Sequence, residues 1–427
     1  MKRPFGSPSA RVRVKHQDVW SIINEAAASS NIQPVTNMGQ GFFGYNPPQF
    51  ILDAAKDAID RVDCNQYAPT KGRLRLRNAI ADTFSSQFGR KLDPQSEIVI
   101  TTGANEGMLS AFMAFLEPGD EVIVFEPFFD QYIHNIEMAG GQVIYVPLSP
   151  PQHVPDRKTS SSDWAYDAAQ LRAAFSEKTR MLVLNNPQNP TGKVFSRAEL
   201  EEIGNLCEQN DVIVLSDEVY DSLSYTDFTH FASLSPRLAR RTLTVGSAGK
   251  CFYCTGWRVG WLIGPSELVQ HVSTAHTRIC FSTVSPFQEA VAIGLEKANK
   301  LGFWERSKEL MRGKIDYFNQ IWIELGLKFS SPQGGYFVLV NFSRVHLPKN
   351  YPLPEHVSTR RRDFHLAWFL IKDLGVAAIP ASEFFTDDNA AGVGDWLRFA
   401  VCKEDDVLDE AMSRLRSLKM YISDGDD

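Results

Sequence analysis

Residues 247–261 read SAGKCFYCTGWRVGW. Lys250 lies in a tight, Gly-flanked part of this stretch, three residues after Ser247 and eight residues before Arg258. A lysine amine condenses with an aldehyde to form a Schiff base. A hydroxyl and a guanidinium can hold a phosphate, because a guanidinium is a rigid fork of donors that matches phosphate oxygens. The stretch therefore indicates a ligand with both an aldehyde and a phosphate.

Pyridoxal 5′-phosphate carries these two groups. We expect Lys250 to bind its aldehyde, and Ser247 and Arg258 to bind its phosphate. The charge of Arg258 is expected to lower the pKa of Lys250 and expose a nucleophilic amine. Taken alone, the stretch also fits an exposed lysine on a Gly-rich turn. Evidence from the rest of the chain is needed to choose between a cofactor-binding lysine and an exposed one.

The composition is that of an ordinary globular protein, with 43% hydrophobic and 22% charged residues among 427. This length favours one large domain and a smaller one. The net charge of −7 gives no general attraction to nucleic acid or acidic membranes. No apolar run approaches the ~20 residues that span a bilayer. The six cysteines are scattered and no signal peptide is evident, so we expect free thiols in a reducing compartment.

The first residues are basic, with Lys2, Arg3, Arg11, Arg13 and Lys15 and no acidic residue before position 18. Such a segment fits either a mitochondrial targeting peptide or a frayed basic terminus. We expect a cytoplasmic protein, with mitochondrial targeting as the alternative.

Strand and helix patterns alternate from about residue 97 to residue 246, which predicts an α/β fold with a mainly parallel, doubly wound sheet. Long helices and further strands follow, and favour a smaller α+β domain. We predict an N-terminal segment (1–48) packed with the small domain, a large cofactor-binding domain (49–300) and a small C-terminal domain (301–427). The polar, proline-bearing residues 149–163 are predicted to form a surface loop.

In such sheets, ligands bind beyond the carboxyl ends of the strands. Asp217 ends a predicted strand there, and its carboxylate would keep the pyridine nitrogen of the cofactor protonated. Tyr220 and Asn189 would contact the 3′ oxygen, and Phe129 would stack on the ring. Each has a plainer alternative: Asp217 as a helix N-cap, Asn189 as a turn residue and Phe129 as part of the core.

Residues 97–107 read as a strand, a Gly-containing turn and the start of a helix, so the backbone amides of Ala104 and Asn105 would meet the phosphate. Arg398 lies inside an apolar strand, where a buried arginine without a partner is costly. We expect it to bind the α-carboxylate of a substrate. Lys250, once displaced by substrate, would move the proton between the substrate Cα and C4′ of the cofactor.

Four ordered motifs resemble fold-type I, class I/II aminotransferases, and the similarity runs from about residue 18 to residue 421. They are NNPQNPTGKVFS (185–196), SDEVY (216–220), SAGKxxxxTGWRVGW (247–261) and LRFAVCK (397–403). Within that family, GQGF (39–42), NQYAPTKG (65–72), VITTGANEG (99–107) and EPFFDQY (126–132) resemble kynurenine–oxoglutarate aminotransferases, also called cysteine-S-conjugate β-lyases or glutamine transaminase K. AHTRICF (275–281) and GYFVLVNFSRV (335–345) are similar to the fungal members.

The resemblance implies a homodimer whose active sites lie at the subunit interface. Tyr67 would then reach the cofactor phosphate of the partner subunit. Trp20, Phe42 and Phe281 would line an aromatic substrate pocket. Substrate contacts are also implied for Gly41, through its backbone amide, and for Asn189.

Three functions remain open on the sequence alone. The first is transfer of the amino group of kynurenine, an aromatic amino acid or glutamine to a 2-oxo acid. The second is C–S β-elimination from cysteine S-conjugates in secondary metabolism. The third is a non-catalytic relative that only binds.

No metal site is expected. Cys251 and Cys254 form a CxxC pair without a second ligand pair at zinc-site spacing, and no HxxxH pair occurs. The first strand is not followed by GxGxxG, which disfavours a nicotinamide dehydrogenase.

Overall fold

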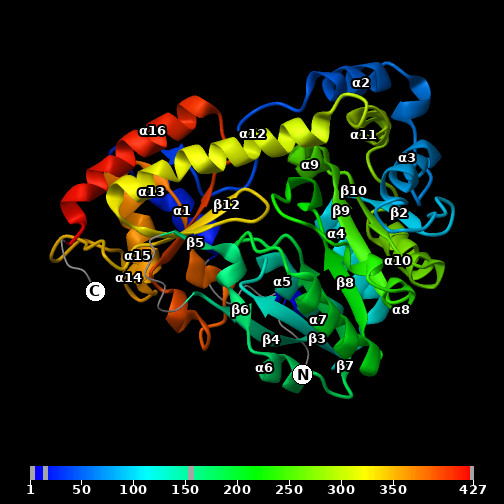
Figure 1. Cartoon of the computed structure of the whole chain (residues 1–427), viewed down its shortest axis with the longest axis horizontal. Helices are drawn as coiled ribbons and strands as arrows, with labels where there is room; N and C mark the ends of the chain where they lie inside the picture. Colours follow the sequence, from blue (N-terminus) through cyan, green and yellow to red (C-terminus); the bar gives the residue numbers. More distant parts are fainter. Residues whose placement is uncertain (1–4, 13–17, 152–157, 424–427) are drawn as a thin grey trace.

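The computed structural model describes residues 5–12, 18–151 and 158–423 of the chain (Figure 1). It contains an eight-stranded sheet, a five-stranded sheet and a two-stranded pair. The long helix α12 (Phe303–Phe318) runs across the molecule from the side of α16 (Asp405–Leu415) to the side of α11 (Ser285–Ala298) (Figure 1). In the described ranges, no helix is both long and apolar enough to cross a membrane.

The larger sheet positions the site. Its strand order is β2-β10-β9-β8-β7-β3-β4-β6. Strands β9, β8, β7, β3 and β4 run parallel, whereas β10 is antiparallel to both of its neighbours and β6 is antiparallel to β4. This confirms the predicted α/β class with a mainly parallel sheet. The strands are β2 (Ile98–Thr101), β3 (Glu121–Glu126), β4 (Gln142–Ser149), β6 (Ala165–Tyr166), β7 (Thr179–Asn185), β8 (Ile213–Asp217), β9 (Thr242–Ser247) and β10 (Gly260–Ile263).

Local signals in the sequence explain where several helices begin. The hydroxyl of Ser196 accepts a hydrogen bond from the backbone N–H of Glu199, whose carboxylate in turn accepts one from the backbone N–H of Ser196. This capping box starts α7. Asp18 caps α1 in the same sense, by accepting from the backbone N–H of Ser21. The other helices are α1 (Val19–Ala28), α2 (Gln49–Ile59), α3 (Leu74–Phe84), α4 (Ala104–Phe115), α5 (Asp130–Ala139), α6 (Ala168–Ala173), α7 (Arg197–Gln209), α8 (Pro236–Ala239), α9 (Ala248–Cys251), α10 (Ser266–Ile279), α11 (Ser285–Ala298), α13 (Gln320–Leu325), α14 (Glu355–Ser358), α15 (Arg362–Phe369) and α16 (Asp405–Leu415).

The smaller sheet corrects one prediction. Part of the segment 149–163, predicted to be a surface loop, forms strand β5 (Lys158–Ser160), which pairs in parallel with β11 (Lys328–Ser331) at the sheet edge. The Thr159 hydroxyl also donates to the Phe329 carbonyl at 3.1 Å. The partner strand comes from much later in the chain, so no local pattern reveals the pairing. In spatial order the strands are β14 (Ile379–Pro380), β15 (Trp396–Ala400), β12 (Phe337–Asn341), β11 (Lys328–Ser331) and β5 (Lys158–Ser160).

The N-terminal part of the chain lies along the C-terminal strands. β1 (Thr36–Asn37) pairs in parallel with β13 (Val376–Ala377). The Ala400 N–H donates to the Met38 carbonyl at 2.6 Å, just beyond this pair. This path brings residues 39–41 beside β15, which carries Arg398. The proposed division into three parts stays a prediction.

Most of the basic N-terminal segment lies outside the described residues. Lys2, Arg3, Arg13 and Lys15 fall there, and Arg11 is exposed. The targeting question therefore stays a prediction.

Candidate active site

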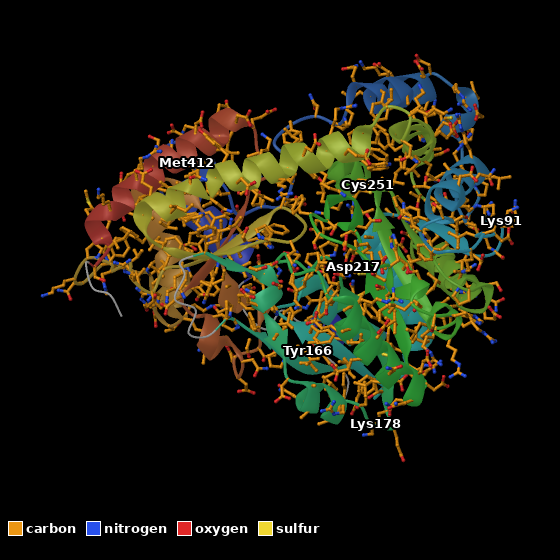
Figure 2. All side chains as sticks on the ribbon, in the orientation of Figure 1. Lys91, Tyr166, Lys178, Asp217, Cys251 and Met412 are labelled. Atoms are coloured by element: carbon orange, nitrogen blue, oxygen red, sulfur yellow. The ribbon has the colours of Figure 1, made fainter. Side chains whose placement is uncertain are left out.

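A cavity of about 240 Å³ opens at the carboxyl ends of β2, β7, β8 and β9. Figure 2 shows Asp217, at the end of β8, near the middle of the molecule. The cavity brings together most of the predicted site residues, although their roles are not tested by their position alone. The predicted residues that line it are Trp20, Gly41, Ala104, Asn105, Phe129, Asn189, Asp217, Tyr220, Ser247, Lys250, Arg258 and Arg398.

Lys250 projects into this cavity from the short helix α9, which follows β9 directly. Its Nζ donates to the Tyr336 hydroxyl at 2.8 Å and to the Gly41 carbonyl at 3.3 Å. The Tyr336 hydroxyl donates to the same carbonyl at 2.7 Å. Tyr336 and the N-terminal segment therefore hold the amine at a fixed place.

Burial lowers the pKa of Lys250 to about 8. The charge of Arg258 also lowers it, as expected, but its contribution is smaller than that of burial. At neutral pH a useful fraction of the amine is therefore free to act as a nucleophile.

The pH dependence of cofactor attachment tests this environment. Because only the neutral amine attacks an aldehyde, attachment to cofactor-free protein should accelerate as pH rises through about 8 and then level off. The measurement is the rate at which borohydride-trapped cofactor appears by mass spectrometry. An increase that continues up to the ordinary lysine pKa near 10.5 would contradict the lowered pKa.

Asp217 lies opposite, at the end of β8, and its side chain is buried. The Tyr132 hydroxyl, from α5, donates to its carboxylate. The Val219 N–H approaches the other carboxylate oxygen at 3.4 Å. Burial raises the pKa of Asp217 to about 6, more than these hydrogen bonds lower it. This fits a carboxylate prepared to face a positive charge.

The other end of the cavity has donors for a phosphate. The helix α4 begins at Ala104, so the Ala104 and Asn105 amides belong to its first turn. Gly103 has φ of +79°, and a Cβ there would lie 2.3 Å from Nη2 of Arg258. Only glycine lets the guanidinium lie against this helix N-terminus. Ser247, at the end of β9, completes the set.

Arg398 comes from β15 of the other sheet and is only 4% exposed. Its Nη1 donates to Asn189 Oδ1 at 3.1 Å, and its Nη2 donates to the Gly39 carbonyl at 2.8 Å. Its Nε has no hydrogen-bond partner, and the described residues place no carboxylate in an ion pair with it. The guanidinium lies over the rings of Phe337 and Phe384, at 4.4 and 4.7 Å. A buried cation with a vacant donor is suited to an incoming carboxylate.

These residues fit pyridoxal 5′-phosphate. The observation that decides this is the arrangement at Gly103, where the absence of a side chain leaves room for the Arg258 guanidinium beside two helix N-terminal amides. Lys250 suits the aldehyde and Asp217 the pyridine nitrogen. The Tyr220 phenol, whose pKa is raised by burial, stays a donor for the 3′ oxygen.

Three predicted residues do not line the cavity of a single chain. Tyr67 is 86% exposed, Phe281 is 51% exposed, and their rings meet edge to face with centroids 5.4 Å apart. Phe42 is 44% exposed, and Nζ of Lys403 lies 4.1 Å from its ring centroid. Their roles in binding stay predictions that depend on a second subunit.

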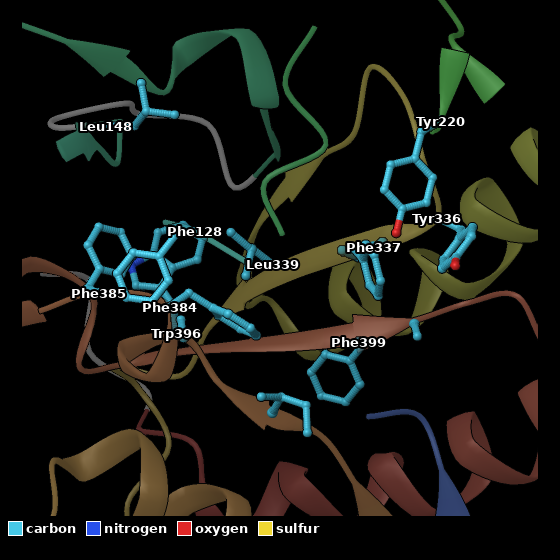
Figure 3. Packing of buried hydrophobic residues seen from close by; sticks show 14 of the residues in the cluster. Phe128, Leu148, Tyr220, Tyr336, Phe337, Leu339, Phe384, Phe385, Trp396 and Phe399 are labelled. Atoms are coloured by element: carbon cyan, nitrogen blue, oxygen red, sulfur yellow. The ribbon is translucent and has the colours of Figure 1, made fainter. Parts of the chain in front are cut away.

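Sequence reasoning missed several residues that shape the cavity. Tyr132 lies one helical turn after Phe129, inside the motif that the family resemblance had already marked. Phe337 begins β12 and Tyr336 directly precedes it, in a segment whose apolar character reads only as core. Figure 3 shows Tyr220, Tyr336 and Phe337 grouped at one end of the buried cluster. Only the alternation of side chains along β12 could have suggested that adjacent residues serve different faces.

The CxxC pair is part of the core. Cys251 and Cys254 are buried, and burial raises the pKa of both thiols. The Cys254 thiol donates to the Ala248 carbonyl at 3.3 Å. All six cysteines are unpaired, as predicted.

Comparisons with known proteins agree with this site. The family model "Aminotransferase class I and II" matches residues 33–415. The probable kynurenine–oxoglutarate transaminase BNA3 of Saccharomyces cerevisiae is 46% identical over 95% of this chain and 93% of its own length. A kynurenine–oxoglutarate transaminase of Dictyostelium discoideum is 37% identical over 96% of each chain. The crystal structure of yeast Bna3p superposes with a TM-score of 0.93 at 47% identity, covering 96% of this chain and 97% of that one.

Proposed function

Because this chain belongs to the class I and II aminotransferase family, we propose that it transfers the amino group of kynurenine to a 2-oxo acid such as 2-oxoglutarate. Family membership confirms the fold-type I class, the aminotransferase activity and the pyridoxal 5′-phosphate cofactor that the sequence predicted. The identity of the amino donor is the part that we propose.

The chain's own residues have distinct tasks. The cofactor, when bound, supplies an electron sink that weakens the bond between the substrate Cα and its hydrogen. Lys250 would act as the base at the substrate Cα and as the acid that returns this proton on the cofactor side. Tyr336 and the Gly41 carbonyl keep the Lys250 amine within reach. Asp217 would face the pyridine nitrogen and favour its protonated form.

The observation that carries the amino acid assignment is Arg398. It is buried, it faces the same cavity as Lys250, and its Nε lacks a partner. An amino acid and a 2-oxo acid share the carboxylate that such a group binds. Trp20, Phe129 and Phe337 line the same cavity and supply apolar surface for an aromatic side chain.

A product assay tests the proposed donor. Purified, cofactor-loaded enzyme is offered kynurenine, phenylalanine, tryptophan and glutamine with several 2-oxo acids, and a cysteine S-conjugate without any oxo acid. We expect kynurenic acid to form only when an oxo acid is present. Rapid release of pyruvate, ammonia and thiol with slow transamination would instead favour the β-lyase. Enzyme that fails to retain cofactor would revive the non-catalytic alternative.

Removing Arg398, the expected partner of the substrate carboxylate, should weaken the binding of every substrate. For Arg398→Ala we expect kcat/KM to fall for both the amino acid and the oxo acid, by roughly 30-fold or more, because about 2–5 kcal/mol is lost when one charge of a buried pair is removed. Initial rates over a range of substrate concentrations measure this. Arg414→Ala is a matched control, since Arg414 bonds to Glu410 and to the Gly375 carbonyl away from the cavity. An unchanged kcat/KM in Arg398→Ala would remove this residue from the site.

We further propose a homodimer with shared active sites. The exposed Tyr67–Phe281 pair lies outside its own cavity, which supports contact with a second copy. The test mixes Tyr67→Ala and Lys250→Ala chains, each inactive or weakened alone. Hybrid dimers should regain one site with wild-type Lys250 and a wild-type Tyr67 from the other chain. A monomer by light scattering, or no recovery in proven hybrids, would contradict the proposal.

We propose a cytoplasmic location, on the composition and free thiols. Imaging the chain with a C-terminal fluorescent tag tests it. Co-localisation with a mitochondrial dye would favour the targeting alternative instead.

A further inference from the structure

We propose that Glu106, His276 and Cys280 form a binding site for a borderline-soft divalent cation such as Zn²⁺. The three residues lie outside the cavity described above and take no part in the amino-transfer reaction. Each residue supplies one ligand atom, namely a carboxylate oxygen of Glu106, a ring nitrogen of His276 and Sγ of Cys280, and these atoms lie within 4.8 Å of one another.

Two helices build the cluster. His276 lies in the last turn of α10, and Cys280 is the C-cap that follows it, with its N–H bonded to the His276 carbonyl at 3.0 Å, so the two side chains lie close together at the end of the helix. Glu106 lies in the first turn of α4, which packs against α10. Neither an HxxxH nor a CxxC pattern marks this site in the sequence, because its helical pair is His-x3-Cys and its third member comes from a distant part of the chain.

The distances suit a metal. Nδ1 of His276 is 2.9 Å from Oε2 of Glu106 and 3.3 Å from Sγ of Cys280. Around tetrahedral zinc, with bonds of about 2.0–2.3 Å, neighbouring ligand atoms are separated by about 3.3–3.6 Å. The two separations from Nδ1 differ from these values by a few tenths of an ångström, and the carboxylate oxygen and the sulfur lie within 4.8 Å of each other.

The surroundings hold the ligands in place. His276 is fully buried. The Ser110 hydroxyl donates to Oε1 of Glu106, and the Thr102 N–H donates to Oε2 at 2.9 Å. The Thr102 hydroxyl lies 3.3 Å from Sγ of Cys280, where an oxygen or a water could complete four-coordination. Outer-shell bonds of this kind fix the orientation of first ligands.

The ligand set selects the class of ion. One carboxylate, one imidazole and one thiol suit Zn²⁺ or Co²⁺, whereas Mg²⁺ and Ca²⁺ require several oxygen ligands. Binding would displace the thiol proton to solvent and form a bond between the metal and sulfur. Without an ion, the same atoms form a hydrogen-bond network, so an experiment must detect the metal–sulfur bond itself.

The test titrates the cofactor-loaded enzyme with Co²⁺ after dialysis against a chelator. We expect one ion per chain, a thiolate-to-cobalt charge-transfer band, visible d–d bands of tetrahedral intensity, and displacement by Zn²⁺. Mg²⁺ should not compete. The metal content of enzyme expressed in zinc-supplemented medium is measured in parallel, which covers a site that fills only during folding.

Variants identify the ligands. Cys280→Ser should weaken Co²⁺ binding by at least about 100-fold and abolish the charge-transfer band. Cys64→Ser is the matched control, since Cys64 is a buried thiol beside Asp63 and far along the chain from the cluster. Binding without a sulfur charge-transfer band in the wild type, or affinity unchanged in Cys280→Ser, would overturn the site. So would the absence of bound ion in both the titration and the expressed enzyme.

Discussion

The Lys250→Ala enzyme is expected to lose covalent cofactor and transaminase turnover together. The variant lacks both the amine that attaches the aldehyde and the group that moves the proton at the substrate Cα. Proton transfer by a positioned side chain is worth up to about 10⁴-fold, so we expect kcat to fall by about that factor or more. Borohydride reduction followed by mass spectrometry measures attachment, and kynurenic acid formation measures turnover.

Lys193→Ala is a matched control for Lys250→Ala. Lys193 is also buried, but its Nζ bonds to Glu199 at 2.9 Å and to the Ser162 carbonyl at 3.2 Å, outside the cavity. Its loss should lower thermal stability and leave the borohydride-trapped cofactor in place. If Lys250→Ala retained either trapped cofactor or wild-type turnover, Lys250 would not be the attachment residue.

The sequence predicts the cofactor side of the cavity well because its residues follow consecutive strands. Asp217 ends β8, Asn189 and Lys250 follow β7 and β9 within a few residues, and the carboxyl ends of parallel strands share one edge. The order of strands along the chain is therefore enough to bring these side chains together.

The other side of the cavity depends on contacts that local patterns do not contain. Gly41 approaches Lys250 only because residues 36–44 lie along β13 and β15. Tyr336 directly precedes β12, far along the chain. The resemblance supplied Gly41, but nothing in the residues around Tyr336 distinguishes a hydroxyl directed at Lys250 from an ordinary core tyrosine.

The main cause of the lowered pKa of Lys250 also could not be predicted from the sequence. The sequence shows Arg258 eight residues away and suggests charge repulsion. The larger cause is the desolvation of an amine enclosed by both sheets, which only the folded structure reveals. Whether a residue is buried depends on the whole fold, whereas a charged residue nearby in the chain can be read directly from the sequence.

The Asp217→Asn enzyme should keep its fold and lose most of its activity. Asparagine carries no negative charge to hold a proton on the pyridine nitrogen, so the weakening of the substrate Cα–H bond should largely disappear. We expect kcat to fall by roughly 10²–10⁴-fold, the range of a lost proton-transfer contribution. Steady-state rates and the thermal unfolding midpoint, measured on the same preparation, separate lost chemistry from lost stability.

A second readout comes from pH and does not require turnover. Burial raises the pKa of Asp217 to about 6, so its negative charge is lost as pH falls through that value. Cofactor affinity of the wild type should therefore weaken below about pH 6, whereas Asp217→Asn should bind cofactor weakly at every pH.

Asp221→Asn is the matched control for Asp217→Asn. Asp221 follows in the same turn, its pKa is also raised to about 6 by burial, and it does not line the cavity. It should therefore leave both the rate and the pH dependence of cofactor binding near those of the wild type. Equal losses in the two variants would mean that any buried carboxyl in this turn serves only the fold, and Asp217 would lose its assignment to the pyridine nitrogen.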